Sequence, residues 1–193
     1  MNTMKNIKQT DRNGLTFTEL MIALSIFGVI MIVLFGFLTG ARNSYSDTRE
    51  RAQYQQTMRA VISLVTREIR STGCDPGEAG FDFFAIADAT QLQCRMDMNG
   101  DSDIADMGPD EDITYSLVGE DLVRNNGSGD EVIMRGIQNL TFTYFNDAGN
   151  QMLAVPLTAA NRALIRYVGI NIQGETERGE PVAYITRIAL RNG

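Results

Sequence analysis

The strongest feature of the hydropathy pattern is an uncharged apolar run near the N-terminus, from Leu20 to Leu38. Its 19 residues include no charged side chain, and Ser25 is its only hydroxyl residue. As an α-helix the run is about 28 Å long, at about 1.5 Å per residue, which nearly matches the ~30 Å hydrocarbon core of a bilayer. Because no side of such a helix is polar, we predict that it is buried in a membrane or in a helix bundle.

The helical pattern continues as an amphipathic stripe from Ala41 to Ser71, where no proline occurs. Apolar residues recur there at steps of three and four, which is the spacing of one helix face: Tyr54, Met58, Val61, Ile62, Val65 and Ile69. Charged residues are predicted on the other faces: Arg49, Glu50, Arg59, Arg67, Glu68 and Arg70. Gly73 and then Pro76 predict that the helix ends just before them. The alternative is two helices separated at 36–40.

After Gly73 the pattern changes to an alternation of apolar and polar residues, which is typical of half-buried strands. The alternating segments are 113–117, 140–144, 168–172 and 182–190, with a tight turn at 118–122 into a returning strand and an early strand around 91–96. Four or five antiparallel strands packed on one helix make an α+β fold. We therefore predict a long N-terminal helix packed on an antiparallel β-sheet head.

The composition excludes several classes of function. The chain of 193 residues has no histidine, which excludes histidine-based triads and histidine-ligated metals. Two cysteines are too few for a four-thiolate cluster. A net charge of -7 argues against binding driven by phosphate neutralisation, so no direct nucleic-acid partner is predicted. No serine nucleophile motif occurs either, and we expect that the protein is not an enzyme.

Charged residues at the start of the apolar run carry topological information. Lys5, Lys8, Arg12 and Asp11 give the first 14 residues a net charge of 3 - 1 = +2, which favours a cytoplasmic N-terminus. Glu19 lies at the edge of the apolar run. An unpaired carboxylate in a membrane is costly, and it marks a candidate functional residue. The alternative is that Glu19 stays hydrated at the interface.

The segment Gly14-Leu15-Thr16-Phe17-Thr18-Glu19 resembles the signature of the type IV pilin-like family. The resemblance implies that a membrane prepilin peptidase cleaves between Gly14 and Leu15 and methylates the new amino group of Leu15. It also implies an assembly role for Glu19, whose carboxylate would pair with that amine on a neighbouring subunit or its own chain. Two positions depart from the family pattern: Leu15 is usually Phe, and Gly36 is often Pro.

The same resemblance predicts four parts of the chain and their locations. They are a leader (1–14), a transmembrane and later filament-core helix (15–40), an amphipathic helix that continues into the head (41–72) and a periplasmic β-sheet head (73–193). The protein would cross the bacterial inner membrane once, with a cytoplasmic N-terminus, before it enters a pilus or pseudopilus. Its partners would be other major and minor pilins and the prepilin peptidase.

The head is similar to that of the PilW class of minor pilins. The likeness rests on the helix end at 67–73, an acidic Asp-Asn-Asp loop and the 113–117 hairpin strand. It implies a minor type IV pilin that primes or caps a pilus and supports adhesion, twitching or DNA uptake. The alternatives are a J-type minor pseudopilin of a type II secretion system, a membrane-anchored periplasmic protein that binds calcium or another ligand and never polymerises, and a membrane-tethered enzyme.

Two further features of the head carry candidate chemistry. Cys74 and Cys94 are the only cysteines, and in an oxidising periplasm they are predicted to form a disulfide. The alternative is two buried free thiols.

The segment 97–106 resembles a calcium-binding loop, because alternate oxygen-bearing side chains can converge on one hard cation. Its candidate ligands are Asp97, Asn99, Asp101, Asp103 and Asp106. Ser102 replaces the usual turn glycine, and the twelfth position is Gly108 instead of Glu. Asp106 or one of the acids at 110–112 (Asp110, Glu111, Asp112) could supply the missing ligand. The alternative is a hydrated acidic loop without an ion.

Overall fold

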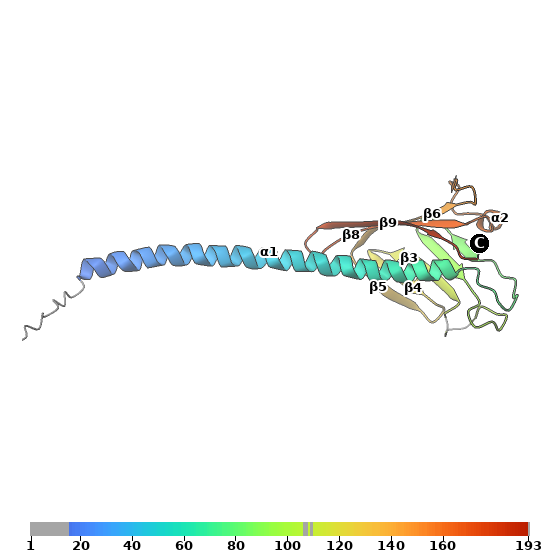
Figure 1. The fold of residues 1–193 in the computed structure, drawn as a ribbon, viewed down its shortest axis with the longest axis horizontal. Helices are drawn as coiled ribbons and strands as arrows, with labels where there is room; N and C mark the ends of the chain where they lie inside the picture. The colour runs from blue at the N-terminus through green and yellow to red at the C-terminus, as the bar shows by residue number, and fades with distance from the viewer. Residues whose placement is uncertain (1–15, 106–107, 109, 193) are drawn as a thin grey trace, which may run out of the picture. The chain divides into compact units, whose positions relative to one another are not determined.

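The computed structural model describes residues 16–105, 108 and 110–192. The chain divides into two compact units, Met1–Asp47 and Thr48–Gly193. Helix α1 (Phe17–Ser71) supplies the described structure of the first unit and the first element of the second (Figure 1).

The first unit is a helix whose apolar side chains are exposed. α1 runs without interruption through 36–40, so the predicted single helix is confirmed over its described residues. A Cβ atom added at Gly28, Gly36 or Gly40 would meet no atom within 4 Å. These glycines therefore pack against no other part of the described chain.

In the second unit, α1 buries one face. The predicted stripe is confirmed, since the buried residues of α1 are Met58, Val61, Ile62, Val65, Glu68 and Ile69. The inclusion of Glu68 corrects our placement of this residue on a solvent-facing side. The helix ends at Ser71, and Gly73 has a φ of +77°, a conformation that glycine adopts without strain. The predicted helix end is therefore confirmed.

The rest of the second unit forms two antiparallel sheets, with nine strands among the described residues. The first sheet has the order β1 (Phe84–Ala87), β2 (Gln91–Arg95), β3 (Asp112–Val118), β4 (Asp121–Asn125), β5 (Asp130–Met134). The second has the order β7 (Gln151–Met152), β6 (Ile137–Phe145), β8 (Tyr167–Glu175), β9 (Pro181–Ala189). A short helix, α2 (Ala159–Arg162), lies between β7 and β8 in the chain.

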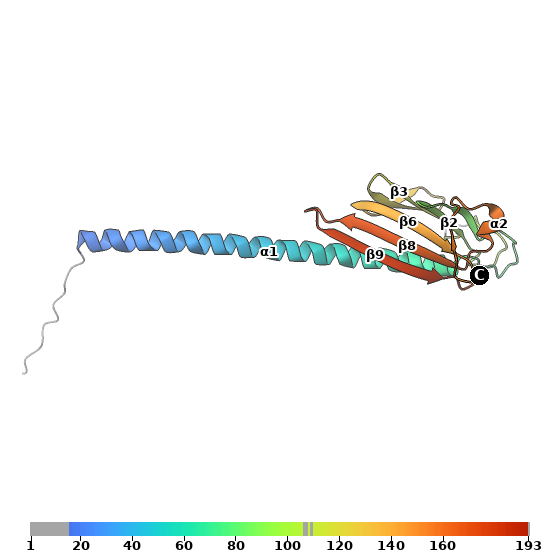
Figure 2. The same ribbon diagram turned by 90° about the horizontal axis from the view of Figure 1, so that it is seen from above.

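One hydrophobic core joins α1 to both sheets. Its members include Ile69 of α1, Leu92 and Tyr115 of the first sheet, and Tyr144 and Ile170 of the second. Figure 1 shows the last turns of α1 with β8 and β9 on one side and β4 and β5 on the other. Figure 2 shows β6, β8 and β9 side by side in the second sheet. The α+β class with a β-sheet head is thus confirmed.

The four alternating segments and the early strand all lie in observed strands: 113–117 in β3, 140–144 in β6, 168–172 in β8, 182–190 mostly in β9 and 91–96 mostly in β2. The turn at 118–122 joins β3 to β4, with Gly119 at a φ of +63°. Our expectation of four or five strands was too low. The additional strands β1 and β7 are only four and two residues long, and three of the five residues of β5 are exposed, so none shows a clear alternation.

Candidate assembly and cation sites

The first turn of α1 is closed by a reciprocal pair of hydrogen bonds between Thr16 and Glu19. The backbone N–H of Thr16 donates to Glu19 Oε2 at 2.9 Å, and its hydroxyl donates to the same oxygen at 2.7 Å. The N–H of Glu19 lies 3.4 Å from Thr16 Oγ1. This arrangement is a capping box, which satisfies N–H groups that have no partner inside a helix. Glu19 therefore has a second role in addition to the predicted one.

The capping role was visible in the sequence as Thr16-x-x-Glu19, a pattern that we did not use. The predicted cleavage positions, Gly14 and Leu15, lie outside the described residues. A partnership between Glu19 and the amine of Leu15 therefore stays a prediction.

The apolar side chains of α1 from Phe17 to Leu38 form a surface that the described chain leaves uncovered. The large apolar residues there are between 37% and 75% exposed, the lowest being Met31 and the highest Phe17. By length and composition α1 can cross a membrane, and it is the one helix in the described residues that can do so. A surface of this size requires lipid or other helices to cover it.

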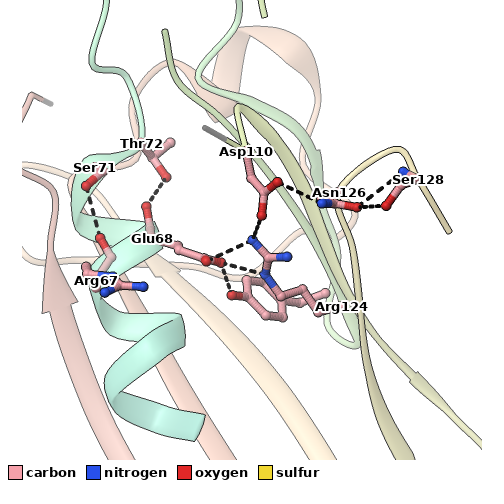
Figure 3. A network of polar contacts seen from close by, with 9 residues as sticks. Arg67, Glu68, Ser71, Thr72, Asp110, Arg124, Asn126 and Ser128 are labelled. Carbon is pink, nitrogen blue, oxygen red and sulfur yellow. Dashed lines mark hydrogen bonds and ion pairs between the residues drawn. The ribbon is translucent and has the colours of Figure 1, made fainter. Parts of the chain in front are cut away.

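Near the other end of α1, Glu68 takes part in a buried ionic network (Figure 3). Arg124 of β4 donates to both carboxylate oxygens of Glu68, from Nη2 at 2.9 Å and from Nε at 3.2 Å. Arg124 Nη2 also lies 2.6 Å from Asp110 Oδ2. The hydroxyl of Tyr115 in β3 donates to Glu68 Oε2. The network thus ties α1 to β3, to β4 and to the segment before β3.

The contacts in this network shift the pKa values of Arg124, Asp110 and Tyr115. Burial alone acts to lower the pKa of Arg124, but its hydrogen bonds with Glu68 and Asp110 outweigh burial, and the pKa is raised. Burial acts to raise the pKa of Asp110, yet hydrogen bonds from Arg124 and Asn126 bring it below its usual value. Burial, and then the charge of Glu68, raise the pKa of Tyr115. Tyr115 therefore stays protonated and acts as a donor to Glu68.

The acidic loop after β2 is organised around two buried carboxylates, Asp97 and Glu111, which are both 0% exposed. The burial of these two carboxylates differs from the hydrated acidic loop that we considered as the alternative to a calcium site. Asp97 accepts hydrogen bonds from the N–H groups of Gly100 and Ser102, the latter at 3.2 Å, and so folds the loop back on itself. Glu111 Oε1 accepts from the N–H of Met98 at 2.8 Å.

The structure brings only part of the predicted calcium ligands together. Ligand oxygens of Asp101, Asp103 and Glu111 all lie within 4.8 Å of one another. Asp97 is outside this group, and its carboxylate accepts hydrogen bonds from the loop backbone. Asn99 lies beside this group, since its side-chain amide donates to Asp101 Oδ2 and its Oδ1 accepts from the N–H of Asp101, both at 2.9 Å. Asp106 lies outside the described residues. Glu111, one of the possible substitutes, is the member that directly precedes β3.

The two cysteines are free thiols in the structure. Cys94 is fully buried in β2, and burial raises the pKa of its thiol to about 12 despite a hydrogen bond with Thr72. Cys74 is partly buried, and its carbonyl accepts from the N–H of Asp97 at 2.7 Å. The chain segments of the two cysteines are thus neighbours, but the predicted disulfide is not formed. The pairing stays a prediction about the oxidised protein.

Comparison with known families identifies the N-terminal part of the chain. Residues 10–35 match the prokaryotic N-terminal methylation motif, which is the prepilin motif of type IV pilin-like proteins. The match includes Gly14, Leu15 and Glu19, and it covers 35 - 10 + 1 = 26 of the 193 residues. A comparison with curated proteins found no matching relative. The chain therefore carries a prepilin-type methylation motif at the start of a long, apolar N-terminal helix.

Proposed function

We propose that the protein is a minor type IV pilin of the PilW class, which primes or caps a pilus after prepilin peptidase has removed residues 1–14. This proposal rests on two features that occur in the same part of the chain. The prepilin motif at 10–35 overlaps the part of α1 whose apolar side chains have no cover within the described chain. A subunit that first resides in a bilayer and then joins a bundle of similar helices needs both.

Maturation depends on the residues at the cleavage site. Gly14 has no side chain to obstruct a protease and lets the backbone extend into its active site. Cleavage after Gly14 gives Leu15 a free amino group, which the same enzyme would methylate. The positive charge of the leader would keep the N-terminus in the cytoplasm. The head would then fold in the periplasm.

Assembly would use the charge of Glu19. Outside water, a carboxylate and an ammonium group are much better paired than separate, although their desolvation offsets much of the gain. A pair between Glu19 of one subunit and the amine of Leu15 on another would fix the axial register of the two helices. The remaining contacts between α1 helices would be apolar and would not specify register by themselves.

The role that we propose for the head is structural and not catalytic. Two sheets on the end of α1 give a rigid surface that a pilus can present near its tip. The same anchor would also serve a J-type minor pseudopilin of a type II secretion system. The partners with which the protein assembles distinguish these two machines.

The experiment that tests the proposal is mass spectrometry of the native protein from its own cells, combined with shearing of surface filaments. We expect the mature chain to begin at a methylated Leu15 and to be released with sheared pili. Recovery with type II secretion components instead would assign it to the pseudopilus. A native chain that begins at Met1 without modification would overturn the proposal, and would favour an anchored protein that does not polymerise.

A further inference from the structure

The loop between β2 and β3 holds a carboxylate oxygen whose partner is absent from the described chain. Glu111 is fully buried. Its Oε1 accepts hydrogen bonds from the N–H groups of Met98, at 2.8 Å, and of Asn99, at 3.4 Å. Its Oε2 is buried and has no hydrogen-bond partner within the described residues. A buried carboxylate oxygen without a partner is strongly unfavourable, because it has lost its hydration and gained nothing.

The positively charged side chains near Glu111 are already paired with other acids. Arg124 forms an ion pair with Asp110 at 2.6 Å, and Arg95 forms one with Asp112 at 3.2 Å. These are the acids on either side of Glu111 in the sequence. Residues 97–112 contain seven acids and no basic residue. The loop therefore concentrates negative charge around Glu111 without a basic side chain of its own.

Two further carboxylates converge on Glu111 from the loop. Ligand oxygens of Asp101, Asp103 and Glu111 lie within 4.8 Å of one another. Calcium binds oxygen at about 2.3–2.6 Å, so oxygens on opposite sides of one ion are separated by about 4.8 Å. The three carboxylates can thus bind one ion together. We propose that Asp101, Asp103 and Glu111 form a calcium site in which Glu111 is the buried ligand and the two aspartates close the site from the solvent side.

The surrounding structure holds the loop in a conformation that suits this site. Asp97 accepts from the N–H groups of Gly100 and Ser102, and Ser102 has a φ of +72°, which is rare for a residue with a side chain. The hydroxyl of Ser102 donates to the carbonyl of Gly77 at 2.7 Å. A Cβ atom at Gly77 would lie 2.7 Å from Asp97 Oδ2, so this approach requires glycine. Asp97 is therefore a positioning residue of the proposed site.

The donor set favours calcium over other common metals. All three ligands are carboxylates, and the chain has no histidine, so zinc and the later transition metals lack their preferred ligands. Two of the three come from an irregular exposed loop, which adapts to the variable geometry of calcium more readily than to the strict octahedron of magnesium. Extracellular calcium modules bind at about 10⁻⁴–10⁻³ M, and we expect an affinity in this range or tighter.

Calcium binding would join the loop to the first sheet. Glu111 directly precedes β3, and its carbonyl accepts from the N–H of Met96 at 2.9 Å. An ion shared by Glu111, Asp101 and Asp103 would therefore attach the exposed end of the loop to the start of β3. The head would present an ordered surface in calcium and a looser one without it, whether or not it belongs to a pilus.

The test is calcium titration of the full-length protein in detergent micelles, after removal of divalent ions with a chelator. We expect saturable heat with one ion per chain, and a Tm that rises by several degrees in millimolar CaCl₂. Millimolar MgCl₂ should raise Tm much less. No heat and no shift in Tm with calcium would overturn the proposal, and an equal response to magnesium would overturn the assignment to calcium.

Variants locate the site. Glu111→Gln keeps the size of the side chain and the acceptor for Met98 and Asn99, but it removes the charge. We expect at least 100-fold weaker calcium binding, and an unfolding temperature in chelator that equals or exceeds that of the unmodified protein. In calcium this order should reverse, because only the unmodified protein gains from the ion.

Asp103→Asn, on the exposed part of the loop, does not threaten the fold, and we expect at least 10-fold weaker binding. Asp147→Asn is the matched control, because Asp147 is an exposed acid in another loop, and this variant should bind as the unmodified protein does. Unchanged binding in Asp103→Asn would overturn the proposed ligand set, and this holds even if Glu111→Gln fails to fold. Weaker binding in Asp147→Asn would overturn the location.

Discussion

The two parts of α1 differ in what covers their apolar residues. From Phe17 to Leu38 the apolar side chains are exposed on every side of the helix, and Ile32, for example, is 74% exposed. From Met58 to Ile69 they form a single stripe, and Ile69 is 0% exposed within a core that also contains residues of both sheets. The first part depends on molecules outside the chain, and the second part depends on the chain itself.

This contrast separates two consequences of mutation. Changes in the first part should alter processing, membrane residence and assembly, but should leave the stability of the head almost unchanged. Changes in the second part should alter the stability of the head directly.

The largest effect is expected at the predicted cleavage site. Gly14→Val places a branched side chain where the peptidase needs an extended, unobstructed backbone. We expect nearly complete retention of residues 1–14, seen as an increased mass of the intact protein from native cells. Asn13→Ala is the control, and it should be processed normally. Full processing of Gly14→Val would contradict the role of Gly14.

Glu19 offers a sharper test, because its two roles can be separated. Glu19→Gln retains a side chain that can close the capping box, but it removes the charge that would pair with an amine. Thr16→Ala breaks the capping box and keeps the charge. We expect Glu19→Gln to insert in the membrane and to be largely absent from sheared filaments, whereas Thr16→Ala is incorporated at a near-normal level. The opposite result would show that capping, and not charge, is what assembly needs.

For the part of α1 that is buried in the head, the largest change in stability is expected when Glu68 loses its partner in β4, through Arg124→Met. This substitution leaves Glu68 buried without its bidentate partner, and should lower the free energy of unfolding by about 3–5 kcal/mol. Guanidinium unfolding of the detergent-solubilised protein, followed by circular dichroism, measures the change. Arg51→Ala removes an exposed ion pair with Glu180 and should change it by at most about 1 kcal/mol.

A double variant identifies the cause of that loss. If the uncompensated charge of Glu68 is responsible, then Glu68→Gln combined with Arg124→Met should recover part of the lost stability. A double variant that is less stable than Arg124→Met alone would mean that the network stabilises the protein mainly by packing.

The comparison between the two parts is tested most directly by one pair of substitutions. Ile69→Ala removes methyl groups from the core of the head and should lower the free energy of unfolding by about 2–5 kcal/mol. Ile32→Ala is the same chemical change on the exposed surface of the first part, and should shift the unfolding of the head by no more than about 0.5 kcal/mol. Equal effects of the two substitutions on the free energy of unfolding would show that the first part of α1 also contributes to the stability of the head.

Local periodicity was enough to predict most elements of the fold. The helix end at Gly73 and the strands around 140–144 and 168–172 follow from patterns that a few neighbouring residues contain. The strand β5 could not be predicted in this way, because its residues mostly face solvent and show no alternation. The division into two sheets was not predicted either, because it depends on pairings between strands that no local pattern records.

The candidate sites were less predictable for a related reason. A charged residue on a helix is normally interpreted as solvent-facing, yet Glu68 is buried by partners 47 and 56 positions further along the chain. Glu111 was considered as one substitute ligand among several. Only the fold of the loop distinguishes it from Asp110 and Asp112, each of which already has an arginine.

The cap on the first turn of α1 has a consequence for recruitment. Within the described residues, both hydrogen bonds that Glu19 accepts end on the same oxygen, Oε2. A carboxylate has a second oxygen with its own lone pairs. One oxygen of Glu19 can therefore cap its own helix while the other accepts a hydrogen bond from an adjacent molecule. In the proposed pilin, such a subunit would exchange lipid for protein neighbours without first breaking a hydrogen bond of its first helical turn.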